Sequence, residues 1–229
     1  MDYSLDFAAI SKKDLNIVGD KAFNLSVLIN KGYPIPKGFV ITSNAFYKFL
    51  EENGISEEIN DLLTNTDVSD YDSLCENSEK IRKKILDGKM PKCVQSEIKE
   101  QYAILGTDKD MHNVSKEQLD LLNARQIDLC VAVRASQYVG QKSKISYNGF
   151  YKSCLFVNGS KGVCDKVQEI WASSFLKELL YARDRFSPDD DLALAVIVQE
   201  MIDADKSGNL STINPTNDNS DFYIESSIG

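Results

Sequence analysis

The sequence is poor in the side chains from which metal centres and nucleophilic dyads are built. It has a single histidine, His112, and its five cysteines are scattered along the chain without a C-x-x-C pair. Zinc sites need several such ligands at close spacing, and disulfide frameworks are typical of small secreted domains. We therefore expect no metal ligands, no disulfide framework and a reducing, cytoplasmic location. His112 is more typical of a surface loop residue than of a catalytic one.

Positive charge and long hydrophobic runs are also scarce. The chain has 26 Lys and Arg against 35 Asp and Glu, which gives a net charge of −9. Such a balance repels nucleic-acid backbones and anionic lipid headgroups. The longest apolar run, Leu192 to Val198, is too short to cross a bilayer, and the segment from Met1 to Leu15 lacks the apolar region of a signal peptide. We expect neither a nucleic-acid partner nor a membrane partner.

The sequence does contain enough apolar material for a globular core. Of its 229 residues, 42% are hydrophobic and 27% are charged, as in an ordinary folded protein. We expect one domain over residues 1–229. Apolar residues recur at helical spacing between Lys21 and Gly32. The next segment contains two prolines, so it is read as extended and leads into a strand over Gly38 to Thr42.

The region from about 56 to 126 changes character and becomes helical and acidic. Leu74, Ile81 and Ile85 mark one amphipathic helix, and a second begins at Pro91. We interpret this region as a helical insertion packed on the core.

The remainder of the chain mixes helical and strand-like patterns. Apolar residues recur at helical spacing from Gly162 to Arg185, with Trp171 expected in the core. The continuous run from Leu192 to Val198 predicts a strand that is buried on both faces. Two further strands are predicted, one ending at Thr212 and one over Phe222 to Ser226.

A polar loop near the middle of the chain is the best local candidate for chemistry. It lies between the strand-like runs Val131 to Arg134 and Cys154 to Val157, and it contains Gly140, Gly149, serines and lysines. The N–H groups of such a loop, together with an arginine at the strand end, can bind an anion such as phosphate. Plain solvated turns have the same composition, so the local pattern leaves both interpretations open.

Three separated blocks, taken together, resemble the nucleotide-binding domain of phosphoenolpyruvate synthase, pyruvate phosphate dikinase and rifampicin phosphotransferase. Val18 to Phe49 is similar to G-G-K-x-x-x-L-x-x-L followed by G-x-P-V-P-x-G-F. Val133 to Val157 is similar to V-R-S-S-A-T-x-E-D, S-F-A-G-Q and L-x-V. Val198 to Pro215 is similar to V-Q-x-M-V followed by S-G-V-x-F-T-x-x-P. The blocks follow the family order, so the resemblance covers nearly the whole chain.

The resemblance implies an α+β, ATP-grasp-like fold in which ATP lies between two lobes. Lys21 matches the family's phosphate-binding lysine, and Arg134 matches the arginine of V-R-S-S, whose planar fork suits phosphate oxygens and catalysis. Gly149 matches the glycine of S-F-A-G-Q, where the lack of a Cβ lets the backbone approach phosphates. Lys21 as a surface helix residue and Arg134 as a salt-bridge partner remain the alternatives.

The resemblance also implies a hinge that reads the adenine base. Gln199, Glu200, Met201 and Ile202 match this segment, whose backbone C=O and N–H groups would face the base edge while Met201 packs on the ring. Met201 as a plain core residue is the alternative.

Several positions depart from the family pattern. Gly140 and Gln141 replace the acidic pair of A-T-x-E-D, Phe150 replaces the last Gln of S-F-A-G-Q, and Ser211 replaces the Phe of S-G-V-x-F-T. Phe150 would crowd a phosphate loop and offers no side-chain hydrogen bond. The chain ends at Gly229, where the family's G-L-G-E segment begins. Most of the second lobe, the phosphohistidine domain and the pyruvate barrel are therefore not expected in this chain.

We expect an ATP-binding domain of a phosphoenolpyruvate-synthase-like phosphotransferase that is incomplete on its own. ATP is the expected cofactor, with Mg²⁺ whose ligands the sequence does not identify. The missing parts would come from a second polypeptide or from self-association. The alternatives are a catalytically inactive regulatory or protein-interaction module that keeps the family fold, and a fragment without an independent role.

Overall fold

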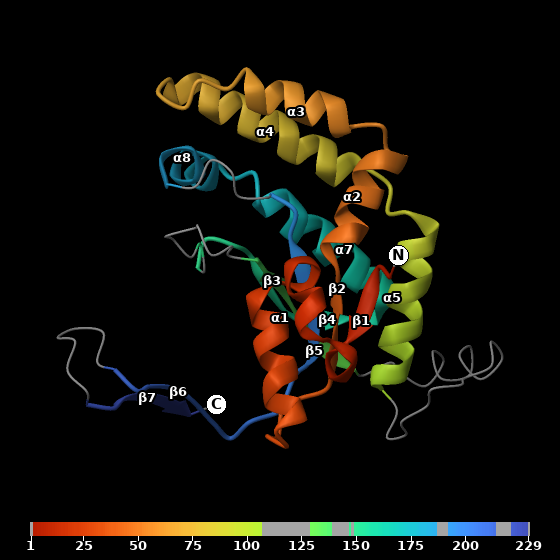
Figure 1. The fold of residues 1–229 in the computed structure, drawn as a ribbon, viewed down its shortest axis with the longest axis vertical. Coiled ribbons are helices and arrows are strands. Elements are labelled where there is room, and N and C mark those ends of the chain that lie inside the picture. Colours follow the sequence, from red (N-terminus) through yellow and green to blue (C-terminus); the bar gives the residue numbers. More distant parts are fainter. Residues whose placement is uncertain are drawn as a thin grey trace.

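The structure is a computed structural model that describes residues 2–106, 129–138, 147, 149–186, 192–213 and 221–228. These residues form a mixed α/β architecture (Figure 1). The strands are β1 (Ser4–Asp6), β2 (Gly38–Ile41), β3 (Cys130–Ser136), β4 (Ser153–Asn158), β5 (Ala195–Glu200), β6 (Lys206–Ser211) and β7 (Tyr223–Ile228). The α-helices are α1 (Leu15–Asn30), α2 (Ser43–Glu52), α3 (Ser56–Thr64), α4 (Tyr71–Asp87), α5 (Lys92–Leu105), α7 (Gly159–Ser173) and α8 (Lys177–Phe186). Two short 3-10 helices, η1 (Phe7–Ala9) and η2 (Lys12–Asp14), precede α1.

Five strands form an antiparallel sheet in the order β1-β2-β5-β3-β4. β5 therefore lies at the centre of the sheet, although it comes late in the sequence. Its residues Ala195 to Val198 are all buried, which confirms the prediction of a strand covered on both faces. The strand begins three residues later than the apolar run does, at Ala195.

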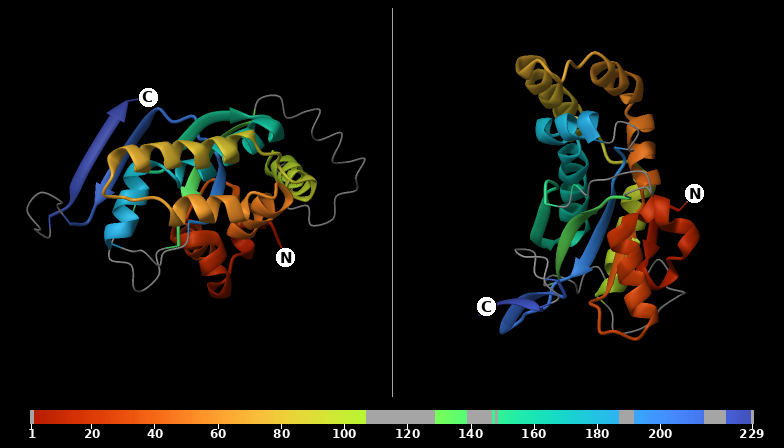
Figure 2. Two further views of the ribbon diagram at one scale, coloured as in Figure 1. Left: turned by 90° about the horizontal axis from the view of Figure 1, so that it is seen from above. Right: turned by 60° about the vertical axis from the view of Figure 1, so that its left-hand side comes forward.

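Helices cover the two faces of the sheet unequally. The larger core lies between the sheet and α2, α4, α5 and α7, and its centre is Trp171, which is 0% exposed. The smaller core lies on the other face, beneath α1 and η1. The right-hand view of Figure 2 shows α1 and α7 on opposite sides of the strands. Trp171 also donates a hydrogen bond from Nε1 to the carbonyl of Leu194, at 3.1 Å, so the predicted core position is confirmed.

The described part of the predicted helical region, up to residue 106, contains α3, α4 and α5, and residues 107–128, which include His112, lie outside the described residues. Two side chains fix this region to the rest of the chain. Ser78 Oγ on α4 donates to the carbonyl of Phe175, at 2.6 Å. Gln168 Nε2 on α7 lies within hydrogen-bonding distance of the carbonyls of Ile85 and Gly88, at 2.6 and 2.8 Å. Carbonyls at a helix end have no partner within the helix, so Gln168 satisfies the end of α4.

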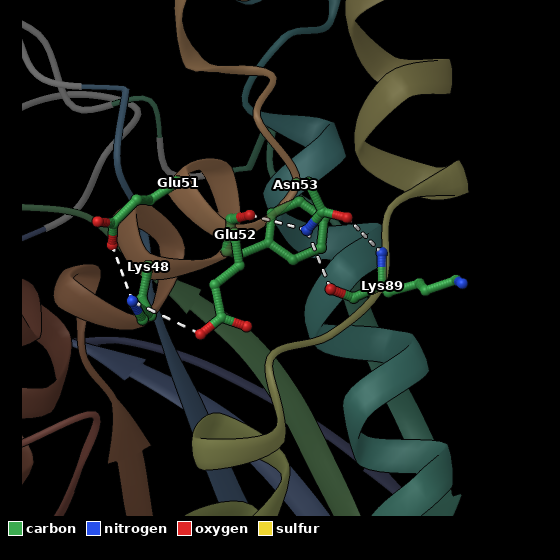
Figure 3. Close-up of polar contacts among 6 residues, drawn as sticks. Lys48, Glu51, Glu52, Asn53 and Lys89 are labelled. Carbon is green, nitrogen blue, oxygen red and sulfur yellow. Dashed lines mark hydrogen bonds and ion pairs between the residues drawn. The ribbon is translucent and has the colours of Figure 1, made fainter.

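The end of α2 is held by the side chain of Asn53 (Figure 3). Its Nδ2 donates to the carbonyls of Phe49 and Lys89, at 2.8 and 3.0 Å, and its Oδ1 accepts from the Lys89 N–H at 2.7 Å. One amide thus joins the end of α2 to the segment between α4 and α5. Lys48, one turn earlier, pairs only with Glu51 and Glu52 at the surface.

Strands β6 and β7 form a separate two-stranded ribbon that projects away from the helices (Figures 1 and 2). Leu210 lies opposite Ile224, and Lys206 lies opposite Ile228. Because paired residues share a face, Leu210, Ile224 and Ile228 lie on one side, where they are 62%, 66% and 90% exposed. The rest of the described chain therefore leaves this apolar side exposed. An isolated two-stranded ribbon of this kind is only marginally stable in water.

Some predicted boundaries are wrong. The helix predicted from Gly162 to Arg185 is two helices, α7 and α8, separated by residues 174–176. Ser173 Oγ donates back to the carbonyl of Ile170 at 2.6 Å, and such back-bonding competes with continuation of the helix. The last strand is Tyr223–Ile228, two residues longer at its end than predicted. No helix among the described residues is long and apolar enough to cross a membrane.

Candidate functional site

The sheet face that carries α1 is covered on only one half. In the described chain, the core beneath α1 includes residues of β2 and β5 but none of β3 or β4. Val131 and Val133 point into the opposite core, so alternation along β3 places Ala132 and Arg134 on the α1 side. Arg134 is exposed, and so is Ser153, its partner on β4. An open strip of sheet therefore runs beside α1.

A glycine lets α1 approach the end of this strip. Gly19 has a φ of 77° and interrupts the helical conformation within α1. A Cβ at this position would lie 2.3 Å from the carbonyl oxygen of Ser136, which is closer than any side chain tolerates. Beyond Gly19, the Asp20 N–H donates to the carbonyl of Gln137 at 2.9 Å, and the Ala22 N–H donates to Ser136 Oγ at 3.1 Å. The helix segment that begins after Gly19 is therefore capped by β3.

This contact brings Lys21 to Arg134. Lys21 Nζ donates to the carbonyl of Ala135, the neighbour of Arg134, with a separation of 3.4 Å. Burial, and then the positive charge of Arg134, lower the pKa of Lys21 below its ordinary value. In the part of the chain that the structure describes, neither cation forms an ion pair. Residues that are 113 positions apart in the sequence thus form one cationic group on the open strip.

The predicted hinge lies at the other end of the strip. Gln199 is half-buried, and its Nε2 donates to the carbonyl of Pro36 at 3.2 Å. The Glu200 N–H donates to the carbonyl of Lys37 at 2.9 Å, which ties the end of β5 to the segment before β2. The side-chain amide of Gln199 is thus already used within the fold.

Met201 spans the open strip at this end. Its N–H donates to the carbonyl of Cys130 at 3.0 Å, so Met201 and Cys130 are cross-strand neighbours. Its Sδ accepts from the N–H of Phe156 on β4, at 3.1 Å. Met201 is half-buried, whereas Ile202 is 62% exposed. The thioether thus lies across β3 and on the open face, away from the larger core.

The neighbouring part of β4 contains a bulge that the sequence patterns did not indicate. Val131 pairs with Val157, but Val133 pairs with Cys154, so Leu155 and Phe156 both face Ala132. Leu155 is 56% exposed and Phe156 is 72% exposed, and Phe156 has a φ of 56°. Left-handed backbone is uncommon for a bulky residue. The apolar run C-L-F-V predicts a strand, but it does not report the register of that strand with β3.

The predicted phosphate loop is described only in part. Gly140 and Gln141 lie outside the described residues. Gly149 has a φ of 106° and forms a turn in which the Phe150 N–H donates to the carbonyl of Tyr147 at 3.1 Å. A Cβ at Gly149 would meet no atom within 4 Å, so its neighbourhood is open, and the Phe150 side chain is 52% exposed.

The open strip as a whole suits an elongated ligand with one apolar end and one anionic end. Leu155 and Phe156 lie level with Ala132, and Met201 lies beside Cys130 with its Sδ at the Phe156 N–H, whereas Lys21 and Arg134 lie toward Ser136. At a rise of about 3.3 Å per residue, Ala132 and Ser136 are about 13 Å apart along β3. That distance is comparable to an extended nucleoside triphosphate, whose base and phosphates differ in polarity in the same way.

Comparison with known proteins identifies the family of this chain. A family model described as "Pyruvate phosphate dikinase, AMP/ATP-binding domain" matches residues 15–229. The chain therefore belongs to this family of ATP-binding domains.

Several relatives that it matches carry the name phosphoenolpyruvate synthase. The chain is 35% identical to the phosphoenolpyruvate synthase of Aeropyrum pernix over 221 residues, which are 96% of this chain and 25% of that protein. It is 31% identical to a probable phosphoenolpyruvate synthase of Methanothermobacter thermautotrophicus, over 99% of this chain and 31% of that protein. A probable phosphoenolpyruvate synthase of Methanocaldococcus jannaschii is also 31% identical, over 96% of this chain and 17% of its own length. The chain thus spans less than a third of each of these relatives.

Proposed function

We propose that this chain is the ATP-binding part of a phosphoenolpyruvate-synthase-like phosphotransferase of the ATP-grasp type. In this proposal the triphosphate lies on Lys21 and Arg134, Gly149 lets the backbone turn of its loop approach the phosphates, and the base lies toward Glu200, Met201 and Ile202. Five free thiols suit the reducing cytoplasm in which such a reaction would run.

The observation that carries the proposal is the convergence of Lys21 and Arg134 at the end of one open strip. Burial, and then the positive charge of Arg134, lower the pKa of Lys21, so the charged form of Lys21 is disfavoured while no carboxylate among the described residues pairs with it. A polyanion between them would reverse the sign of the interaction. The salt-bridge alternative for Arg134 has no carboxylate partner in the described residues.

The same pair has a role in phosphoryl transfer under this proposal. Proteins that catalyse this reaction act chiefly by positioning and by stabilising charge on the transferred phosphoryl group. Arg134 would bind two phosphate oxygens at once through its planar guanidinium, whereas Lys21 would act as a single charge. The acceptor would be brought by a second polypeptide or by another copy of the chain.

Mg²⁺ normally accompanies ATP and neutralises part of its charge. Among the described residues, no group of three or more His, Cys, Asp and Glu side chains is placed to bind a metal ion. Gln137 Oε1 is buried without a hydrogen-bond partner and is an oxygen of the kind that Mg²⁺ accepts, but one ligand does not define a site. The described residues therefore do not fit a metal centre, and no step is assigned to one.

Titration calorimetry with ATP and Mg²⁺ on the 229-residue chain tests the proposal. Replacing Lys21 by Met should weaken binding about 10- to 100-fold, because a charged hydrogen bond contributes about 1.5–3 kcal/mol. Arg134→Lys keeps the charge but loses the two-pronged contact, so it should weaken binding less than Lys21→Met does. Lys31→Met is the matched control, because Lys31 is an exposed residue just past the end of the same helix.

The same titrations distinguish ATP binding from the competing function, a non-catalytic interaction module. If the unmodified chain binds no ATP at high micromolar concentration, with or without Mg²⁺, the proposal fails and a non-catalytic interaction module becomes the better description. An equal loss of affinity in Lys21→Met and Lys31→Met would show that only net charge matters, and would also contradict the proposed site.

A further inference from the structure

We propose that Phe156 is the residue that selects the base of the bound nucleotide, by stacking its ring on a purine. This inference rests on the proposed function and adds to it a specificity-determining residue on β4. Its starting point is an aromatic side chain that the fold presents to solvent at the apolar end of the open strip.

The backbone of Phe156 is held in an uncommon conformation. Its φ of 56° lies in the left-handed region, which costs a residue with a Cβ free energy. The bulge places one more residue on β4 than on β3, and Phe156 is one of the two residues that oppose Ala132. An uncommon backbone of this kind persists only where its surroundings enforce it, and it clusters at ligand sites.

The surroundings of Phe156 enforce the exposed position. Its N–H is turned out of the β3–β4 ladder and donates to Met201 Sδ, at 3.1 Å. The backbone of Phe156 is therefore anchored beside the thioether, while its side chain stays 72% exposed. Burying the phenyl ring would lower the free energy of the chain. The bulge instead leaves the apolar surface of this ring in contact with water. A flat apolar ligand would cover that surface.

The position along β3 identifies which part of a nucleotide would meet the ring. Phe156 lies level with Ala132, two residues from Arg134 and on the side away from Lys21. With the phosphates on the cations, the base of a nucleoside triphosphate reaches Ala132. Phe156 and Met201 would then cover the base, since aromatic rings and thioethers both pack well on flat π systems.

The hinge offers comparatively few free groups for reading the base edge. The N–H groups of Glu200 and Met201 already donate to the carbonyls of Lys37 and Cys130. Stacking does not distinguish one purine from another by hydrogen bonds, because each base has a π face. Selection at Phe156 should therefore favour purines over pyrimidines more strongly than it separates ATP from GTP.

The test compares a complete nucleotide with its phosphates alone. Binding of ATP, CTP and inorganic triphosphate to the 229-residue chain is measured by calorimetry for the unmodified protein and for Phe156→Ala. We expect the variant to bind ATP about 10-fold more weakly, to lose most of the preference for ATP over CTP, and to bind inorganic triphosphate unchanged. Phe156→Tyr should bind ATP as the unmodified protein does.

Phe186→Ala is the matched control, because Phe186 ends the distant helix α8 and is 57% exposed. It should leave all three affinities unchanged. If ATP binds equally well to Phe156→Ala and to the unmodified chain, this inference is overturned while the ATP site stands. If Phe156→Ala weakens ATP and inorganic triphosphate alike, the ring acts through the fold and the inference is again overturned. If the unmodified chain binds none of the three ligands, the proposed function itself fails and this inference fails with it.

Discussion

The two faces of the central sheet differ in how far their apolar side chains are buried and their charged side chains are paired. On the face covered by α2, α4, α5 and α7, the apolar side chains of the strands are buried and aromatic rings pack on Trp171. On the open strip of the other face, two cations lie together, Phe156 has a left-handed backbone, and apolar rings meet solvent. The first face contributes stability, whereas the second keeps like charges and apolar surface without a partner among the described residues. Changes on the two faces should therefore have different consequences.

The largest expected effect is a loss of stability on the packed face. Phe49 is 0% exposed, and its ring centroid lies 5.4 Å from that of Trp171. Phe49→Ala removes this packing and leaves a cavity, so unfolding should cost about 3–5 kcal/mol less in the variant. Urea denaturation followed by far-ultraviolet circular dichroism measures the change. Phe156→Ala, the same substitution on the open face, should change stability by less than about 1 kcal/mol, and an equal loss in both would remove the contrast between the faces.

The next largest effect is expected where the open face meets α1. Gly19→Ala must accommodate both a positive φ and a contact with the Ser136 carbonyl, so it should destabilise the chain by about 2–4 kcal/mol and weaken ATP binding by displacing Lys21. Gly32 also has a positive φ, of 81°, but a Cβ at this position would meet no atom within 4 Å. Gly32→Ala should therefore cost only about 1 kcal/mol and leave ATP binding intact. Equal losses of stability in the two variants would show that the close approach of α1 and β3 is unimportant.

A smaller effect is expected from the polar junction at the end of α2. Asn53→Ala removes the side chain that satisfies groups of both Phe49 and Lys89, so it should lower stability by about 1–2 kcal/mol in the same urea titration. Lys48→Ala breaks only surface ion pairs and should produce no measurable change. Neither substitution should alter ATP affinity, because both positions lie on the packed side of the sheet.

The sequence predicted the packed face better than the open one, for a physical reason. Repeated apolar spacing reports burial directly, so helices α4 and α5 and the central strand β5 were recognised, and Trp171 was placed correctly. The break between α7 and α8 was missed because apolar spacing continues across it, and the back-bonding of the Ser173 hydroxyl to Ile170 changes no apolar position.

The open face was predicted only where a family pattern could be matched. Resemblance identified Lys21 and Arg134, and the structure brings them together, but their binding roles remain predictions. The bulge at Phe156 depends on the register between two strands, and no pattern within one strand reports a register. The contact of Gly19 with Ser136 joins residues far apart in sequence and was missed for the same reason.

The smallest effect on stability, and the one that tests the open face most directly, concerns the protonation of Lys21. Its pKa is lowered in the folded chain by burial and by Arg134, whereas the unfolded chain should have the ordinary value of 10.5. The folded state therefore binds this proton less tightly, so the cost of keeping Lys21 charged is fully present below the folded pKa and disappears as the pH rises toward 10.5.

Lys21→Met removes that cost at every pH. The variant should be slightly more stable than the unmodified chain near neutral pH, and the difference should shrink as the pH rises through the window between the two pKa values. ATP affinity of the unmodified chain should fall over the same window, because the bound phosphates need the charged form. Urea titrations and ATP titrations at matched pH values measure both trends, with Lys31→Met as the control that keeps the environment of Lys21 intact. A stability difference that does not change with pH would mean that neither burial nor Arg134 disfavours the charged form of Lys21, and the two cations would then be ordinary surface residues.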